Sequence, residues 1–208
     1  MSASTQRTAL TLGLLVGIAL LLVLVMERMT EPLVARSRAQ TLERELAAVL
    51  PAPDPARTGD ADRWVPDASP DEPDEPDAPR WIERRWLDGR LEAMALSVVA
   101  PDGYSGDIEL LVGVRADGTL SGVRVLEHRE TPGLGDDIER HRSDWITEFD
   151  GLSLHTVPAR DWAVRRQGGR FDAFTGATIT PQAVVGAVHR ALRWVERHAD
   201  ALSRAPPP

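Results

Sequence analysis

The sequence predicts an α+β protein: a single N-terminal transmembrane helix, then a domain with a mostly antiparallel sheet and a C-terminal helix. Three observations carry this prediction. An uncharged apolar run occupies residues 8–26, two apolar segments flank an Asp-Gly pair at residues 117–118, and apolar residues at helical spacing follow Pro181. Strands that precede a terminal helix are typical of α+β domains.

The composition narrows the classes of function. The chain has 208 residues, a formal net charge of −8 and no cysteine. A nucleic-acid-binding protein would present a basic face, so the charge argues against nucleic acid. Without cysteine the chain cannot hold an iron–sulfur cluster on its own thiolates or use a thiol nucleophile. The five histidines show no metal-ligand spacing, and we expect no metal site. Redox chemistry requires a bound organic cofactor or a metal, because the side chains offer no ready alternative.

The apolar run at residues 8–26 fits a membrane anchor. As a helix it would be about 28 Å long, which is close to the thickness of a bilayer's hydrocarbon core. A cleaved signal peptide is the alternative, but the run is longer than a signal core and no small-x-small site follows it directly. Arginines lie on both sides, so the positive-inside rule does not choose an orientation. We assign residues 8–28 to a transmembrane helix.

The next segments predict a spacer. Residues 29–50 read as a stalk helix, with Leu42, Leu46 and Leu50 four apart. Residues 51–80 combine eight prolines with many Asp and Glu, a composition that cannot bury enough apolar surface to order itself. We expect an extended, self-repelling linker there, with no site.

The folded domain is expected over residues 81–198, followed by a disordered tail at 199–208. The Asp-Gly pair between residues 108–114 and 120–126 is a strong hairpin signal. The other expected elements are a strand at 93–100, a helical turn at 145–149, a strand at 162–166 and a turn at 167–169. The six tryptophans are expected to pack in the core.

The stretch Asp172-Ala-Phe-Thr-Gly-Ala-Thr178 is the first candidate site. Thr180 suits a helix N-cap and Pro181 the first helical position. A helix N-terminus stabilises an anion, and Gly176 lets the backbone turn or approach a bulky ligand. The loop therefore suits a phosphate beside Thr178, although a capped helix after a glycine turn is the simpler alternative.

The stretch His128-Arg-Glu-Thr-Pro-Gly-Leu-Gly135 is the second candidate. Pro132 and Gly133 suit the central positions of a type II turn, with positive φ at Gly133. Gly135 adds a second position without a side chain. Such a loop exposes N–H groups and admits a flat ring closely, whereas an ordinary surface turn is the alternative.

Two resemblances extend this interpretation. The pattern Asp-x-x-Thr-Gly-Ala-Thr resembles the motif on which flavin transferases attach FMN through a phosphoester to the last Thr. Four features follow one another along the chain: Gly-Tyr-Ser-Gly at 103–106, the hairpin, Glu-Thr-Pro-Gly-Leu-Gly and this motif. Together they closely resemble the RnfG/RsxG family, the G-type component of the Rnf-type (Rsx-type) ion-translocating electron transport complex. The C-type component of the sodium-pumping NADH:quinone oxidoreductase is also similar, but the motif spacing and the short chain favour Rnf. The resemblance covers residues 91–192 and the anchor, not the linker, and Gln167 stands where the family often has Asp.

The resemblance implies a single-pass protein of the bacterial inner (cytoplasmic) membrane, with residues 1–7 cytoplasmic and the FMN-binding domain periplasmic. It implies FMN joined by a phosphoester to Thr178, in a loop shaped by Thr175, Gly176 and Ala177, with Asp172 important to the flavin transferase through the magnesium ion of that reaction. The contacts to the ring would come from the second candidate loop, through Glu130, Thr131, Gly133 and Leu134.

The implied partners are the membrane, the flavin transferase and the other membrane and peripheral subunits of the complex. By family, that complex moves electrons between ferredoxin and NAD and couples this to ion transport. The protein would relay electrons and turn over no substrate alone. Two alternatives stay open: a membrane-anchored flavin-binding redox sensor or regulator, and a structural anchor protein with a vestigial flavin loop.

Overall fold

The chain forms two compact units, Met1–Glu43 and Arg44–Pro208. The computed structural model describes residues 3–52, 59–66 and 77–204, and only the backbone at residues 3–11 and 29–36. Most of helix α1, Ala3–Val49, lies in the first unit, and its last turns belong to the second. The helical conformation predicted for the apolar run and for the stalk is therefore confirmed.

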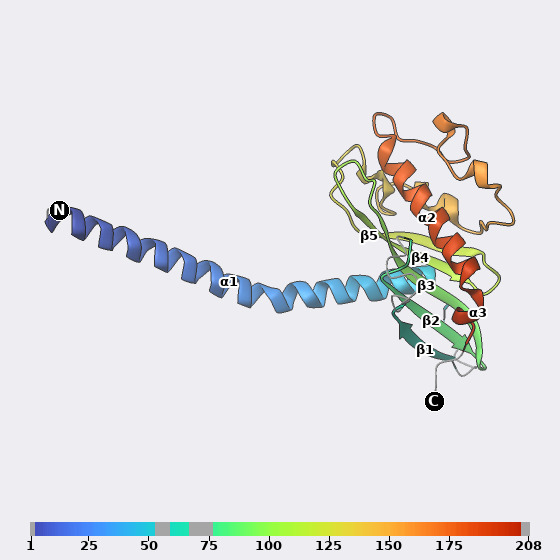
Figure 1. Ribbon diagram of the computed structural model, residues 1–208, viewed down its shortest axis with the longest axis horizontal. Coiled ribbons are helices and arrows are strands. Elements are labelled where there is room, and N and C mark those ends of the chain that lie inside the picture. The colour runs from blue at the N-terminus through green and yellow to red at the C-terminus, as the bar shows by residue number, and fades with distance from the viewer. Residues whose placement is uncertain (1–2, 53–58, 67–76, 205–208) are drawn as a thin grey trace. The chain divides into compact units, whose positions relative to one another are not determined.

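The second unit is built on a five-stranded antiparallel meander (Figure 1). Its strands lie in chain order and are β1 (Gly59–Trp64), β2 (Trp81–Leu87), β3 (Arg90–Ala100), β4 (Ile108–Arg115) and β5 (Leu120–Glu127). The β4–β5 hairpin and the strand at 93–100 confirm the sequence predictions, and Gly118 takes a φ of +81° in the hairpin turn. The α+β prediction is thus confirmed for this unit.

Strand β1 corrects the prediction of an extended linker over residues 51–80. Its Asp62 accepts hydrogen bonds from Arg84 Nη2 at 2.5 Å and from Trp86 Nε1 at 2.6 Å, both on β2. Arg63 pairs with Glu83 in the same way, at 2.8 Å. Two charged residues of this segment, Asp62 and Arg63, are therefore paired with opposite charges on β2. Residues 53–58 and 67–76 of the same prediction lie outside the described residues.

Helix α2, Ile179–Arg197, packs on one face of the sheet (Figure 1). Its predicted apolar stripe is buried through Val184, Val188, Leu192 and Val195. These side chains join the alternate residues of β3 and β4 in one hydrophobic cluster, because successive strand residues point to opposite faces. A short helix, α3 (Ala199–Leu202), follows where a disordered tail was expected.

The segment between β5 and α2 contains four 3₁₀ helices: η1 (Asp136–Ile138), η2 (Trp145–Phe149), η3 (Ala159–Asp161) and η4 (Arg165–Gln167). Helix η2 confirms the predicted helical turn, and Gly168, with φ +84°, confirms the predicted turn at 167–169. The strand predicted at 162–166 is wrong. Only an isolated bridge joins Val164 to Phe171, because the chain enters helix η4 at Arg165.

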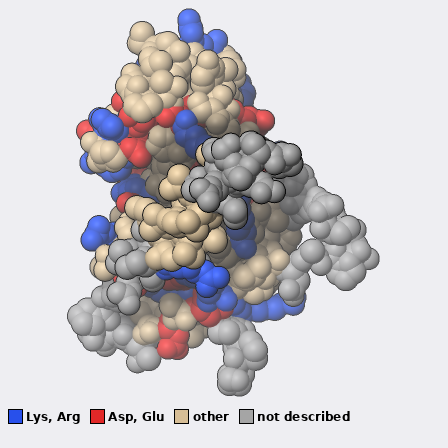
Figure 2. Space-filling view, turned by 90° about the vertical axis from the view of Figure 1, so that its left-hand side faces the viewer, with Lys and Arg blue, Asp and Glu red and all other residues tan. Residues whose placement is uncertain are grey.

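The surface charges are interspersed. Figure 2 shows basic and acidic groups scattered between larger uncharged areas among the coloured residues. Ion pairs of the second unit include Arg80 with Glu109 at 3.3 Å and Arg190 with Asp77 at 3.0 Å. Exposed pairs of this kind contribute about 0–1 kcal/mol each, so the apolar core and its two covered sheet faces dominate the stability.

The predicted membrane span is not reproduced within the described residues. Among them, no helix is both long enough and apolar enough to cross a membrane. The span predicted at residues 8–28 falls in part on residues 8–11, whose side chains lie outside the described residues.

The last turns of α1 cover the second face of the sheet. Val49 is 1% exposed, and its carbonyl oxygen accepts a hydrogen bond from the Ser121 hydroxyl of β5. Glu45 pairs with Arg124 of the same strand at 3.6 Å. The bare backbone of Gly113 makes this approach possible, because a Cβ there would lie 2.6 Å from the Val49 carbonyl oxygen.

Substituting Gly113→Ala should therefore lower the free energy of unfolding by about 1–3 kcal/mol, the usual cost of overpacking. Urea unfolding followed by tryptophan fluorescence measures this. The matched control is Gly122→Ala on the paired strand, where a Cβ would meet Val49 Cγ1 at an ordinary 3.4 Å. Equal stability of the two variants would contradict the close approach of α1 to the sheet.

Candidate functional site

Helix α2 begins two residues earlier than the sequence suggested. Thr178 is the N-cap residue and Ile179 the first helical residue, so the N-cap prediction for Thr180 is wrong. Thr180 instead lies buried in the first turn and donates its hydroxyl proton to Glu130 Oε2 at 2.5 Å. Pro181 falls on the third helical position, where its missing N–H removes no intrahelical bond. Thr178 therefore lies at the N-terminus of α2.

The loop before the helix is a tight turn. The Ala177 N–H donates to the Phe174 carbonyl at 3.1 Å, and Gly176 lies within this turn with φ +84°. Glycine adopts this left-handed conformation without strain, so the predicted role of Gly176 in turning the backbone is confirmed. Thr175, also within the turn, is exposed to solvent.

The second candidate loop forms the predicted Pro-Gly turn. The Leu134 N–H donates to the Thr131 carbonyl at 3.1 Å, and Gly133 has φ +77°. The Asp136 carboxylate closes the turn by accepting the Gly133 N–H at 2.6 Å. Since Asp136 is itself 4% exposed and pairs with Arg142 at 3.3 Å, the loop is held by buried charge.

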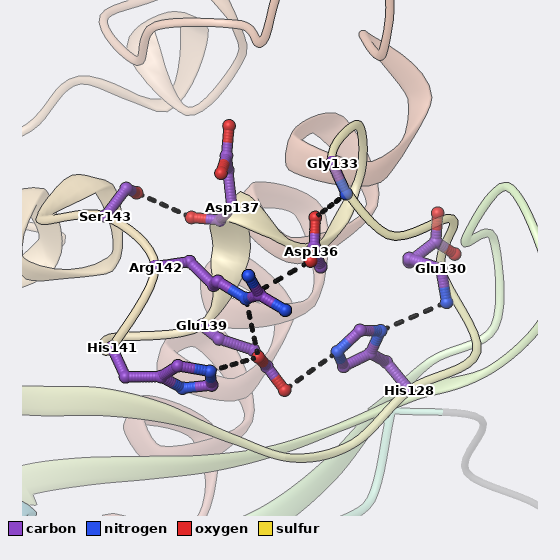
Figure 3. A network of polar contacts seen from close by, with 9 residues as sticks. All are labelled: His128, Glu130, Gly133, Asp136, Asp137, Glu139, His141, Arg142 and Ser143. Carbon is purple, nitrogen blue, oxygen red and sulfur yellow. Dashed lines mark hydrogen bonds and ion pairs between the residues drawn. The ribbon is translucent and has the colours of Figure 1, made fainter.

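A wider polar network fixes the start of this loop (Figure 3). His128 Nδ1 accepts the Glu130 N–H at 3.0 Å, so its Nε2 carries the hydrogen that faces Glu139 Oε1 at 3.0 Å. His141 and Arg142 approach the same carboxylate, at 3.1 and 4.0 Å. His128 is thus a satisfied histidine, in line with the sequence interpretation of the histidines.

Glu130 joins three segments of the chain. Its side chain is 4% exposed, and besides the bond from Thr180 it accepts the Ser105 N–H at 3.0 Å. Gly135 must lack a side chain here, because a Cβ would lie 2.8 Å from Glu130 Oε2. Gly103 is equally constrained, with Glu130 Oε1 at 2.9 Å from such a Cβ. Both carboxylate oxygens are therefore engaged in holding the site together.

These segments enclose a pocket of about 210 Å³. Three of the large apolar side chains that the second unit leaves exposed stand around it: Tyr104 (69%), Leu134 (46%) and Ile179 (52%). Exposed apolar groups gathered at one pocket mark a binding site. The remaining lining residues are Glu130, Thr131, Gly135, Gly176, Ala177, Thr178 and Thr180.

The charges beside the pocket have separate partners. Arg166 Nη1 donates to Thr178 Oγ1 at 3.0 Å, whereas its neighbour Arg165 pairs with the exposed carboxylate of Asp172 at 2.9 Å. Burial raises the pKa of Glu148, and the nearby Asp172 carboxylate raises it further. A cation at Thr178 beside an apolar pocket fits a ligand with a phosphate at one end and a flat ring at the other, as in FMN.

The structure brings together most of the residues that the sequence singled out. Thr178, Gly176 and Ala177 line the pocket opposite Glu130, Thr131 and Leu134. Thr175, Gly133 and Asp172 are not among its lining residues.

Sequence reasoning missed Tyr104, Ile179 and Arg166 as site residues. Tyr104 could have been identified, because its Gly-Tyr-Ser-Gly stretch is part of the family resemblance. Nothing in the sequence distinguishes Arg166 from its neighbour Arg165.

The comparisons with known proteins agree with this site. The FMN-binding domain family matches residues 103–193, which include every residue that lines the pocket. The G subunit of the ion-translocating oxidoreductase complex of Pseudomonas aeruginosa (strain PAO1) is 44% identical over 206 residues, which cover 97% of this chain and 95% of the relative. The similarity therefore extends beyond residues 91–192 and the anchor, where the sequence analysis had placed it.

Two further relatives carry the same name. The protein of Vibrio cholerae (strain O395) is 50% identical over 121 residues, covering 58% of each chain, and that of Escherichia coli O157:H7 is 53% identical over 119 residues, covering 57% of this chain and 58% of the relative. With an FMN-binding domain and an end-to-end relative at this identity, the chain belongs to the family of G subunits of ion-translocating oxidoreductase complexes.

Proposed function

We propose that this protein relays electrons within a membrane-bound ion-translocating complex linked to ferredoxin and NAD, through FMN held covalently on Thr178. The observation that carries the proposal is the pocket in which Thr178 faces the Glu130–Leu134 loop, beside the exposed ring of Tyr104. FMN, when bound, supplies the one- and two-electron chemistry that these side chains lack. The chain's own share is to hold the cofactor and leave it accessible to neighbouring redox subunits.

Attachment is a group transfer to the Thr178 hydroxyl. Its oxygen forms a bond to the flavin-bearing phosphorus of an activated flavin dinucleotide, and the bond from that phosphorus to the nucleoside monophosphate breaks. The monophosphate leaves, and the hydroxyl proton passes to a base of a flavin transferase. The product is a phosphodiester with one negative charge beside the start of α2, where the dipole stabilises it.

The pocket is too small to enclose a whole cofactor. Its volume of about 210 Å³ is below the roughly 300 Å³ at which small-ligand pockets begin. We therefore place one part of the ring between Tyr104, Leu134 and Ile179 and leave the rest open to solvent. A covalent tether keeps such an exposed group at high effective concentration near its site.

We further propose that residues 8–28 anchor the protein in the bacterial inner membrane and that the FMN domain is periplasmic. Residues 12–26 carry no charge, and their large apolar side chains are exposed, for example Leu12 (64%), Leu22 (65%) and Met26 (69%). Such a run is costly in water, and a bilayer would cover it.

Replacing the Tyr104 ring tests the placement of the cofactor. In the flavin-loaded protein, Tyr104→Ala should raise flavin fluorescence and increase its quenching by added iodide, because an aromatic side chain no longer covers the ring. Tyr104→Phe, which keeps an aromatic side chain over the ring, should leave the iodide quenching as in the wild type. Val65→Ala, at an exposed apolar residue that does not line the pocket, is the matched control. Unchanged fluorescence and iodide quenching in Tyr104→Ala would contradict the placement.

Partner association separates the relay from a redox sensor. Affinity purification of the tagged full-length chain from mild detergent should recover integral membrane subunits of the complex, and deletion of the chain should stop electron transfer through it. A solitary protein whose deletion leaves the activity of the complex normal would favour the sensor.

A further inference from the structure

Arg166 contacts the hydroxyl of Thr178, the proposed attachment residue. Its guanidinium donates to Thr178 Oγ1 at 3.0 Å, and no carboxylate in the described part of the chain pairs with it. A threonine hydroxyl is neutral and uses only one donor of the five that a guanidinium offers. Among the described residues, the exposed guanidinium of Arg166 therefore has no carboxylate partner, and it lies at the hydroxyl of the proposed attachment residue.

The loop that carries Arg166 is held on both sides. Helix η4 ends at Gly168 in the left-handed conformation, and the Gly169 N–H returns to the Val164 carbonyl at 3.2 Å. Val164 is fully buried and is tied to α2 by its hydrogen bond to Gln182. Thr178 is the N-cap residue of the same helix, so the backbone that carries Arg166 and the hydroxyl of Thr178 are tied to a common element.

The neighbouring arginine has a different role. Arg165 uses Nη1 to pair with Asp172 and Nε to donate to the Arg170 carbonyl at 3.2 Å. Consecutive arginines thus point to different partners, one to a carboxylate and one to the attachment hydroxyl. The ion pair with Asp172 needs only Arg165 and does not explain the contact of Arg166 with Thr178.

We infer that Arg166 is the positioning residue that binds the flavin phosphate at Thr178, first in the incoming donor and then in the finished phosphodiester. A phosphodiester has two non-bridging oxygens and one negative charge, which the planar fork of a guanidinium matches. Before transfer, the donated hydrogen bond occupies a lone pair of Thr178 Oγ1 and leaves the hydroxyl proton free for the base of the transferase. This inference rests on the proposed attachment at Thr178.

The test measures the rate of flavin attachment by a purified flavin transferase, with flavin dinucleotide as donor, from in-gel fluorescence after denaturation. Arg166→Ala should be modified about tenfold or more slowly, as expected for a lost charge-assisted hydrogen bond. Arg166→Lys should recover part of the rate, and Arg166→Gln, which keeps a donor without the charge, should stay slow. Arg160→Ala is the matched control, since Arg160 is 86% exposed and pairs with the adjacent Asp161; it should match the wild type.

A second readout follows the finished ester. In the loaded protein, the ³¹P resonance should shift in Arg166→Ala and stay unchanged in Arg160→Ala. Wild-type attachment rates in Arg166→Ala or Arg166→Gln, or an unmoved ³¹P resonance in Arg166→Ala, would overturn the role of Arg166 alone. Flavin on Thr178→Ala, or none on the wild type, would overturn the proposed attachment itself, so the two failures are distinguishable.

Discussion

Thr178→Ala should contain no covalent flavin. When the chain is co-expressed with a flavin transferase, denatured on a gel and viewed under ultraviolet light, the wild type should give a fluorescent band and the variant a dark one. The reason is that Thr178 supplies the only hydroxyl positioned between Arg166 and the pocket in the described part of the loop. Thr178→Ser, which keeps the hydroxyl, should retain the band.

The control for this prediction lies three residues away. Thr175 carries the same hydroxyl on the same turn, but it is exposed and does not line the pocket. Because Thr175 belongs to the attachment motif, the control is Thr175→Ser, which keeps the hydroxyl of the motif and should stay fluorescent. A bright Thr178→Ala band would show that the attachment site is elsewhere.

Glu130→Ala should destabilise the protein more than any other single substitution in the site. It removes the acceptor of two hydrogen bonds, a part-buried one from the Ser105 N–H and a buried one from the Thr180 hydroxyl. Hydrogen bonds to charged groups contribute about 1.5–3 kcal/mol each, so we expect a loss of about 3–5 kcal/mol in the free energy of unfolding. Urea unfolding measures the loss, and the flavin attachment rate should fall with it because the pocket loses its central support.

Two further variants isolate the Glu130 interaction. Thr180→Val removes one donor only, and a double-mutant cycle with Glu130→Ala should give a coupling of about 0.5–3 kcal/mol. Glu127→Ala, at an exposed carboxylate three residues earlier, should change stability by less than about 0.5 kcal/mol. A loss below about 1 kcal/mol for Glu130→Ala would contradict its role in joining the three segments, since even one hydrogen bond to a charged group contributes more.

The features that the sequence predicted correctly depend on local chemistry. The hairpin follows from Asp117-Gly118, the site loop from Pro132-Gly133 and the attachment turn from Gly176, each with positive φ at the glycine. In each case the glycine conformation and the neighbouring residues suffice, because the hydrogen bonds that close the turn lie within a few positions.

The features that it missed depend on partners far along the chain. Thr180 has the composition of an N-cap residue, but a carboxylate fifty positions earlier accepts its hydroxyl. Strand β1 has the composition of a linker, yet its Asp62 meets Arg84 and Trp86 across the sheet. Residue propensity and spacing do not encode such pairings, so the start of α2 and strand β1 could not be derived from them.

The mass of the tryptic peptide over residues 171–190, isolated from the assembled complex in its native host, tests the central claim most directly. The account predicts an increase equal to FMN less one water, with fragment ions that place it on Thr178. An unmodified peptide from a complex that still transfers electrons would contradict it.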